Sequence, residues 1–224
     1  MPNDHIVDLS QKLEPNMIYY PGDPAFHCVS HTSIETEGCN VHSMTIGSHT
    51  GTHVDAPYHF FQDGKTIDEL PLSTFIGKAL VINLTSKRAR EPIVWADLAP
   101  FSDAMGPDVI LLLHTGWSTH WNTPKYFDHP FLTPHCAEQL VGKGVHALGV
   151  DTLSPDETRI DGTEGAFGFG VHKVMLGSGG IIAENLTNIA AVADERDATI
   201  SLVPLNISGC DGSPIRAFAT ITAV

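Results

Sequence analysis

A short run of histidine and aspartate residues, positions 48–60, contains the groups best suited to chemistry. It places His49, His53, Asp55 and His59 within eleven residues. Imidazole and carboxylate groups together suit a divalent cation such as Zn²⁺ or Mn²⁺. Scattered surface or core histidines are the alternative interpretation, but four potential ligands in one polar run favour a metal site.

The spacing of these four residues requires the chain to bend. They share one parity, so an extended strand would place them on one face, but it would separate His49 from His53 by roughly 13 Å. That distance is too long for one ion. Gly51 and Pro57 permit or impose a bend. A single helical turn over residues 49–53 would also bring the histidines together, although glycine and threonine are weak helix formers.

A complete metal site needs further ligands, and the best candidates lie late in the chain. His172 and Glu184 stand in a segment that is otherwise mostly apolar, residues 171–186. A carboxylate in such a run needs a partner, and a cation is a suitable one. A position at the start of a helix is an equally good interpretation of Glu184 from its own sequence context.

Composition and charge exclude several classes of function. The chain has 224 residues, with 12 Lys and Arg against 26 Asp and Glu, and a formal charge of −14. Nucleic acids and anionic membranes require a basic face, so neither is expected as a partner. The four cysteines form no Cys-x-x-Cys pair, and neither an export signal nor a membrane-length apolar run is visible. We therefore expect free thiols and a cytoplasmic protein.

The pattern of apolar residues predicts one mixed α/β domain over residues 1–224. Short runs rich in Val, Ile and Leu, bounded by Gly, Pro or Asp, predict buried strands at 79–84, 109–113, 147–150 and 198–203. Helices are fewer. One is predicted from Pro134 to Lys143, with Thr133 as N-cap and Gly144 as terminator, and a short one at 93–98.

The whole run from 49 to 59 resembles the signature of the cyclase family of metal-dependent hydrolases, which includes bacterial kynurenine formamidase and isatin hydrolase. That signature, His-x-Gly-Thr-His-x-Asp-x-Pro-x-His, is intact here. Weaker matches follow the family order over nearly the whole chain. They stand at residues 8–10, 20–24, 115–117, 149–154 and 214–217.

The resemblance implies a role for each matching residue. His49, His53 and Asp55 would be metal ligands, completed by His172 and Glu184, with His59 as general acid and base. One or two ions would be bound. The resemblance further implies a swivelling β/β/α fold, with a mixed sheet core and few helices, and assembly as a homodimer or homotetramer.

The chemistry implied is hydrolysis of a C–N amide bond in a small aryl formamide or cyclic amide. A divalent cation activates water and polarises a carbonyl, and an imidazole can carry a proton to the departing nitrogen. Opening of a lactone, cyclisation or dehydration would use the same site. A metal-binding protein without turnover is a further alternative, but it would not need His59.

Aromatic residues supply candidates for the walls of a substrate pocket. Tyr20, beside a Pro-Gly-Asp turn, matches a substrate-facing position of the family, and Phe167 and Phe169 lie in a glycine-rich segment. Ordinary core packing is the alternative for each of them. The sequence contains no Gly-x-Ser-x-Gly elbow, P-loop or complete dinucleotide fingerprint. Serine hydrolases and nucleotide enzymes are therefore poor interpretations.

Overall fold

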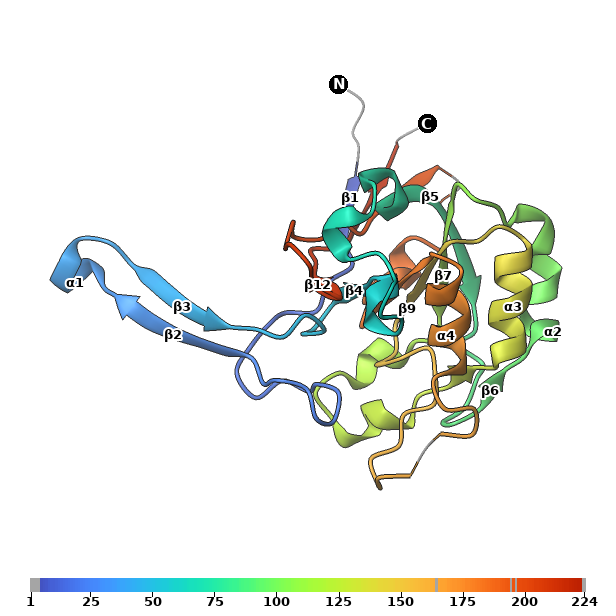
Figure 1. Cartoon of the computed structure of the whole chain (residues 1–224), viewed down its shortest axis with the longest axis horizontal. Coiled ribbons are helices and arrows are strands. Elements are labelled where there is room, and N and C mark those ends of the chain that lie inside the picture. The colour runs from blue at the N-terminus through green and yellow to red at the C-terminus, as the bar shows by residue number, and fades with distance from the viewer. Residues whose placement is uncertain (1–4, 164, 194, 196, 223–224) are drawn as a thin grey trace.

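A nine-stranded mixed sheet runs through the molecule in the computed structural model, which describes residues 5–163, 165–193, 195 and 197–222 (Figure 1). The strand order is β1-β13-β11-β5-β7-β9-β10-β4-β12, and β5, β7, β9 and β10 are parallel. The strands of this sheet are β1 (His5–Asp8), β4 (His53–Asp55), β5 (Ile76–Asn83), β7 (Val109–His114), β9 (Ala147–Val150), β10 (Ile181–Glu184), β11 (Ala198–Ser201), β12 (Gly212–Pro214) and β13 (Phe218–Ile221).

The central strands are buried on both faces, which is why their sequences read as continuous apolar runs. Along β7, Ile110 and Leu112 join one hydrophobic cluster, whereas Leu111 and Leu113 join the other. All four predicted strands are present, as β5, β7, β9 and β11.

Three helices cover one face of the sheet: α2 (Trp95–Leu98), α3 (Pro134–Gly142) and α4 (Gly170–Gly177). The helix predicted from Pro134 is α3. Gly144 follows it with a φ of +83°, a left-handed conformation that suits glycine. The sequence did not predict α4, because it follows a glycine-rich segment and has a glycine at each end.

The other face curls around a second core. Side chains from β4, β9 and β10 and from β11 and β13 belong to one hydrophobic cluster, although these strands lie in different halves of the sheet. The sheet therefore forms a half-barrel. The predicted α/β class, with a mixed sheet and few helices, is confirmed.

A hairpin arm projects from this body (Figure 1). It consists of β2 (His27–Thr32), α1 (Ile34–Glu37) and β3 (Val41–Thr45), and β2 pairs only with β3. A further small sheet joins β6 (Pro92–Ile93) to β8 (Phe131–Leu132). The four cysteines are unpaired, and no helix within the described residues has the length and apolarity to cross a membrane.

Candidate metal centre and active site

Strand β4 positions the first part of the site. It lies between β10 and β12, and its register places Glu184 opposite His53. His53 and Asp55 are two positions apart, so their side chains share one face of the strand, and Glu184 shares it too. Asp55 Oδ1 and Glu184 Oε2 each lie 3.3 Å from His53 Nε2.

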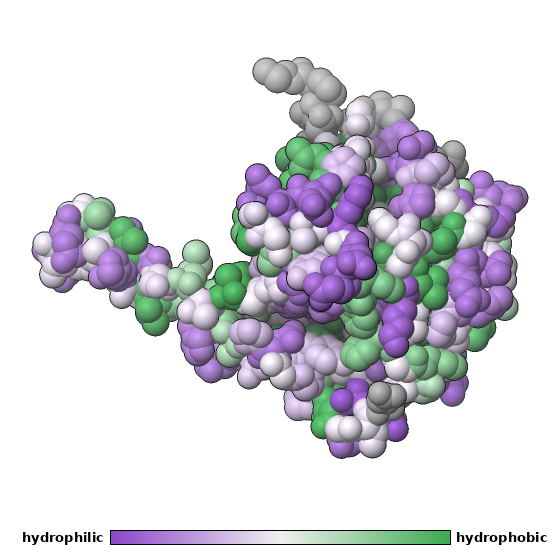
Figure 2. All heavy atoms as spheres, viewed as in Figure 1, coloured by the Kyte–Doolittle hydropathy of each residue, from purple (hydrophilic) through white to green (hydrophobic). Residues whose placement is uncertain are grey.

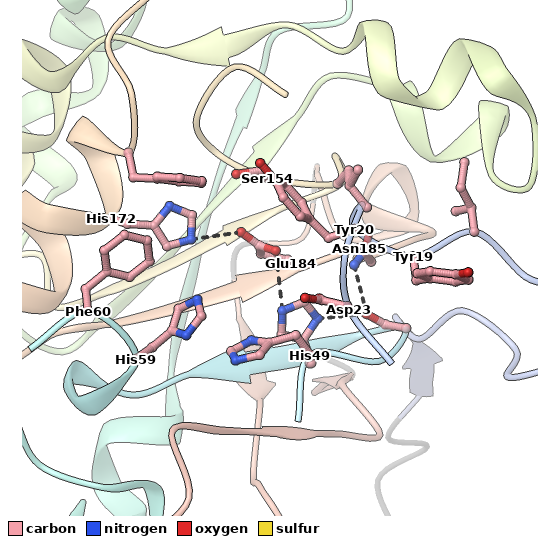
Figure 3. Close-up of a pocket in the computed structure, with 15 residues that line it drawn as sticks. Tyr19, Tyr20, Asp23, His49, His59, Phe60, Ser154, His172, Glu184 and Asn185 are labelled. Atoms are coloured by element: carbon pink, nitrogen blue, oxygen red, sulfur yellow. Dashed lines mark hydrogen bonds and ion pairs between the residues drawn. The ribbon is translucent and has the colours of Figure 1, made fainter. Parts of the chain in front are cut away.

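Helix α4 places His172 next to the same two carboxylates. Its Nε2 atom lies 3.2 Å from Glu184 Oε1 (Figure 3). The same atom lies 3.4 Å from Asp55 Oδ2. Its Nδ1 atom donates to Asp156 at 2.7 Å, and Asp156 also accepts from the backbone N–H groups of Val171 and His172. Asp156 therefore caps α4 and orients the ring, a common arrangement behind metal-binding histidines.

The chain before β4 bends at Gly51, as the spacing of the histidines required. Gly51 has a φ of +64°, and a Cβ atom there would approach Leu13 Cδ2 to 2.3 Å. The Gly51 carbonyl accepts a hydrogen bond of 2.9 Å from His53 Nδ1, which turns His53 Nε2 toward the carboxylates. Residues 49–53 form a turn leading into a strand rather than a helical turn.

His49 and His59 lie side by side at the edge of the cluster, with ring centroids 4.0 Å apart. His49 Nδ1 lies 2.8 Å from Asp55 Oδ1, and His49 Nε2 lies 2.9 Å from Asp211 Oδ2. The same Asp211 oxygen lies 3.3 Å from His59 Nδ1. A Cβ atom at Gly212 would come within 2.9 Å of the His49 ring, so a glycine is needed beneath it.

Two buried carboxylate oxygens indicate that the cluster fits a cation. Asp55 Oδ2 and Glu184 Oε1 are buried, and within the described residues neither makes a hydrogen bond, although His172 Nε2 lies 3.4 Å and 3.2 Å from them. Leaving such atoms unpaired is costly, and a divalent cation would satisfy them. Two sets of three ligand atoms lie within 4.8 Å of one another, and both include Asp55: one adds His53 and Glu184, the other His49 and His59. A shared carboxylate can serve one ion or bridge two.

The electrostatics also favour a cation. Burial lowers the pKa of His53, but hydrogen bonds to Asp55 and Glu184 outweigh it and raise that pKa to about 10. Burial is likewise outweighed at His49, where Asp211 and Asp55 raise the pKa to about 9. Imidazoles must lose these protons before they can act as ligands, so cation binding releases protons and weakens at low pH.

The cluster forms one wall of a cavity of about 170 Å³. Another wall is aromatic. The Phe60 and Phe169 ring centroids are 5.3 Å apart, and those of Tyr20 and Phe169 are 6.3 Å apart. Phe167 does not line this cavity; it is 49% exposed and lies near Phe131. Of the three aromatic residues suggested by the sequence, Tyr20 and Phe169 therefore face the site.

Asn185 makes hydrogen bonds to three segments around the site. Its side-chain amide donates to the Gly51 carbonyl at 2.8 Å and accepts from the Tyr126 hydroxyl at 3.0 Å. Its backbone carbonyl accepts from the Thr52 hydroxyl at 2.7 Å. These hydrogen bonds hold residues 51–52, just before β4, against the end of β10. Asn185 can therefore support the site without being a metal ligand.

The sequence reasoning missed Asp156, Asp211, Asn185 and Phe60. Asp156 follows Ser154-Pro155, and Asp211 stands between Cys210 and Gly212 in a loop. Neither spacing alone predicts a contact with a histidine far away in the chain. Phe60 directly follows His59, and this adjacency was the only available signal.

The half-barrel and its cluster of imidazoles and carboxylates define a candidate metalloenzyme. The chain belongs to the putative cyclase family, whose sequence model matches residues 7–157. A kynurenine formamidase from Bacillus cytotoxicus is 34% identical over 94% of this chain and 95% of that protein. One from Bacillus cereus is 33% identical over 97% of this chain and 98% of that protein.

Solved structures share the fold. Isatin hydrolase A from Labrenzia aggregata, bound to benzyl benzoate, superposes with a TM-score of 0.88 at 23% identity, covering 98% of this chain and 94% of that one. A potential metal-dependent hydrolase with cyclase activity superposes with a TM-score of 0.75 at 25% identity, covering 99% of this chain and all of that one.

Proposed function

We propose that this protein is a metal-dependent hydrolase that cleaves the C–N amide bond of a small aryl formamide. One observation carries the proposal: two buried carboxylate oxygens, on Asp55 and Glu184, make no hydrogen bond within the described residues and lie beside His172 Nε2. Glu184 and His172 line a cavity that has an aromatic wall. The family membership and the kynurenine formamidase relatives support this reaction class.

His49, His53, Asp55, His172 and Glu184 are the residues that would hold the metal. Their nitrogen and oxygen donors suit Zn²⁺ or Mn²⁺, and the sharing of Asp55 between two ligand sets allows one ion or two. When bound, the cation acidifies a water molecule and polarises the amide carbonyl. Ionised Asp55 and Glu184 would contribute two negative charges toward balancing it.

His59 is the residue that would move protons. It stands at the mouth of the site, partly exposed, and Asp211 holds its Nδ1 side. That contact leaves the other ring nitrogen free to take a proton from the attacking water and deliver it to the departing nitrogen. An imidazole suits this role because the same ring nitrogen can accept a proton and later donate it.

The aromatic wall supports an aryl substrate. Tyr20, Phe60 and Phe169 present ring faces and edges beside the metal ligands. A flat aryl ring would pack against them and place its formamide over the cluster. A cyclic aryl amide or an aryl lactone would make the same contacts, so these are the alternatives to test.

The first experiment is elemental analysis of the purified protein, with assays before and after chelation. We expect stoichiometric zinc or manganese, and turnover of N-formylkynurenine that a chelator abolishes and added metal restores. N-formylaniline and N-formylcyclohexylamine form a matched pair that differs in aromaticity. A preference for the aryl member is expected if the aromatic wall selects the substrate.

Other outcomes would redirect the proposal. Turnover of isatin but not of N-formylkynurenine would favour a cyclic amide, and turnover of an aryl lactone alone would replace the amide. Bound metal without any turnover would favour a metal-binding protein. Absence of metal after reconstitution would refute the proposal. We also propose a cytoplasmic location, from the free cysteines, and assembly as a homodimer or homotetramer.

A further inference from the structure

The cavity is the place to expect recognition of a small aryl substrate. On the face of the molecule shown in Figure 2, hydrophobic and hydrophilic residues are interspersed over the body. The rings of Phe60 and Phe169, by contrast, gather in the cavity beside the metal ligands. Groups that distinguish one aryl substrate from another are therefore to be sought among the residues that line the cavity.

Asp23 is a carboxylate of the cavity that the proposed mechanism does not use. Among the described residues, two carboxylates line the cavity, those of Glu184 and Asp23 (Figure 3). Glu184 lies beside His53 and His172. Of the ion pairs between described residues, none includes Asp23, and neither set of three possible metal ligands contains it. Asp23 can therefore bind a group that comes from outside the protein.

A tight turn fixes the position of Asp23. Its backbone N–H donates to the Tyr20 carbonyl at 3.0 Å, which closes the turn. Pro21 at the second position and Gly22 at the third, with a φ of +102°, are features of a type II turn. Tyr20 belongs to the aromatic wall, with its ring centroid 6.3 Å from that of Phe169. The turn therefore holds Asp23 next to the ring surface that would bind an aryl group.

The Asp23 side chain is partly withdrawn from water without a close partner. Burial raises its pKa, and this effect outweighs the charges of His49, His53 and His59, which lower it. Each of these histidines has a different carboxylate within 3.3 Å. A carboxylate in this position gains stability from a hydrogen-bond donor on a ligand.

We propose that Asp23 accepts a hydrogen bond from the amide N–H of the substrate and thereby selects aryl amides over esters and lactones. The inference rests on the proposed function and narrows it. In an aryl formamide the N–H group is bonded directly to the ring, so a ring packed against Tyr20 brings this N–H toward the neighbouring Asp23. The side-chain oxygen of Asn185, another acceptor of the cavity, already accepts from the Tyr126 hydroxyl.

The same carboxylate disfavours an ester or a lactone. These substrates present an oxygen atom where the amide presents N–H, and two acceptors that face each other repel. A site built to hydrogen-bond an N–H group discriminates strongly against analogues that lack it, because its own polar group is left unpaired. Among substrates that share the aromatic contacts, Asp23 therefore favours open-chain and cyclic amides and disfavours lactones.

The hydrogen bond should strengthen as the reaction proceeds. The N–H bond is not broken: during C–N cleavage His59 gives one further proton to the nitrogen, and the products are an aryl amine and formate. The nitrogen becomes more positive as that proton arrives, so its N–H donates more strongly to a carboxylate. An interaction that is stronger in the transition state than in the bound substrate raises kcat. Loss of the Asp23 carboxylate should therefore lower kcat for the amide.

The test compares N-formylaniline with phenyl formate, which has a similar shape but an oxygen atom in place of the N–H group. Both are assayed with the unmodified protein, with Asp23→Asn, and with Asp63→Asn, a matched control that makes the same change at an exposed residue outside the cavity. In Asp23→Asn the ratio of kcat/KM for the amide to that for the ester should fall by about 10–100-fold, the effect of one hydrogen bond to a charged group. Metal content and circular dichroism should be unchanged, and Asp63→Asn should keep the original ratio.

Four results would overturn the inference. The first is an equal loss of activity toward both substrates in Asp23→Asn, and the second is loss of metal from that variant. The third is the same change of ratio in Asp63→Asn. The fourth is a loss confined to N-formylkynurenine, which would make Asp23 a site for the ammonium group of that substrate instead.

Binding of two analogues without a formyl group supplies a measurement that needs no turnover. Calorimetry should show that acetanilide binds the unmodified protein more tightly than phenylacetone, which has CH₂ in place of N–H. Asp23→Asn should reduce this difference, and an undiminished difference would also overturn the inference. Failure of the unmodified protein to turn over N-formylaniline would count against the proposed function, but it would leave this comparison of binding valid.

Discussion

Replacing His59 distinguishes between two possible roles of this residue, as a proton carrier and as a metal ligand. His59 lies close enough to His49 and Asp55 for all three to contact one ion, yet it is half-buried at the edge of the cluster. The buried set of His53, Asp55 and Glu184 remains complete without it. His59→Ala should therefore retain stoichiometric metal. Its kcat should fall by about 10²–10⁴-fold, the usual contribution of a general acid–base group, which corresponds to about 3–5 kcal/mol in the barrier.

The assay pairs elemental analysis with steady-state kinetics on N-formylkynurenine. His135→Ala is a suitable control, because His135 is an exposed histidine on α3 that pairs only with Glu138. Imidazole added to the His59→Ala protein should restore part of the activity, since the deletion opens space at the mouth of the cavity. Loss of metal from His59→Ala would make His59 a ligand, and full activity would refute any catalytic role.

Three further predictions concern single residues. His53→Ala should lose both bound metal and turnover, and activity in the metal-free variant would contradict the metal mechanism. Asp211→Asn should keep the metal but lower kcat/KM by about 10–100-fold, the usual cost of losing a carboxylate that orients the histidines of a metal site. Unchanged kinetics would show that the contacts of Asp211 with His49 and His59 are dispensable. Burial lowers the pKa of His129 to about 4, against 6.5 when exposed. The unfolded chain therefore binds an extra proton between these values, and stability should fall by up to about 3 kcal/mol as pH drops from 6.5 to 4. The free energy of unfolding, measured with urea, should depend less steeply on pH in His129→Gln than in the unmodified protein. An identical dependence would refute the lowered pKa of His129 as its cause.

Local sequence patterns predicted the elements whose own residues are mostly apolar or carry clear start and stop signals. The strands β5, β7 and β9 are apolar throughout, and α3 has proline at its start and glycine beyond its end. The prediction was less successful where stability comes from neighbours. Strand β4 is three residues long and polar at both ends, and it is held by β10 and β12 rather than by its own propensity. The arm has no hydrophobic periodicity that distinguishes it from a loop.

The site residues also divide into those that local sequence could predict and those that depend on tertiary structure. His49, His53, Asp55 and His59 lie close in sequence, and their types and spacing sufficed to place them together. His172 and Glu184 were suggested by an unusual polar residue in an apolar context, and their convergence on β4 required the sheet register. The supporting carboxylates could not be found in this way. Asp156 matters because it caps α4, and Asp211 because β12 pairs with β4, and both facts depend on tertiary structure.

The register of the sheet makes the metal site and the fold interdependent. Glu184 meets His53 only when β10 pairs with one edge of β4, and Asp211 meets His49 only when β12 pairs with the other edge. Closing these pairs buries two carboxylate oxygens, on Asp55 and Glu184, that make no hydrogen bond within the described residues although His172 Nε2 lies near both, and this opposes folding. A cation that binds the closed arrangement but not the unfolded chain offsets that cost. Residues that complete the sheet around β4 therefore contribute to metal affinity without touching the ion, and changes that loosen those strand pairs should weaken metal binding and stability together.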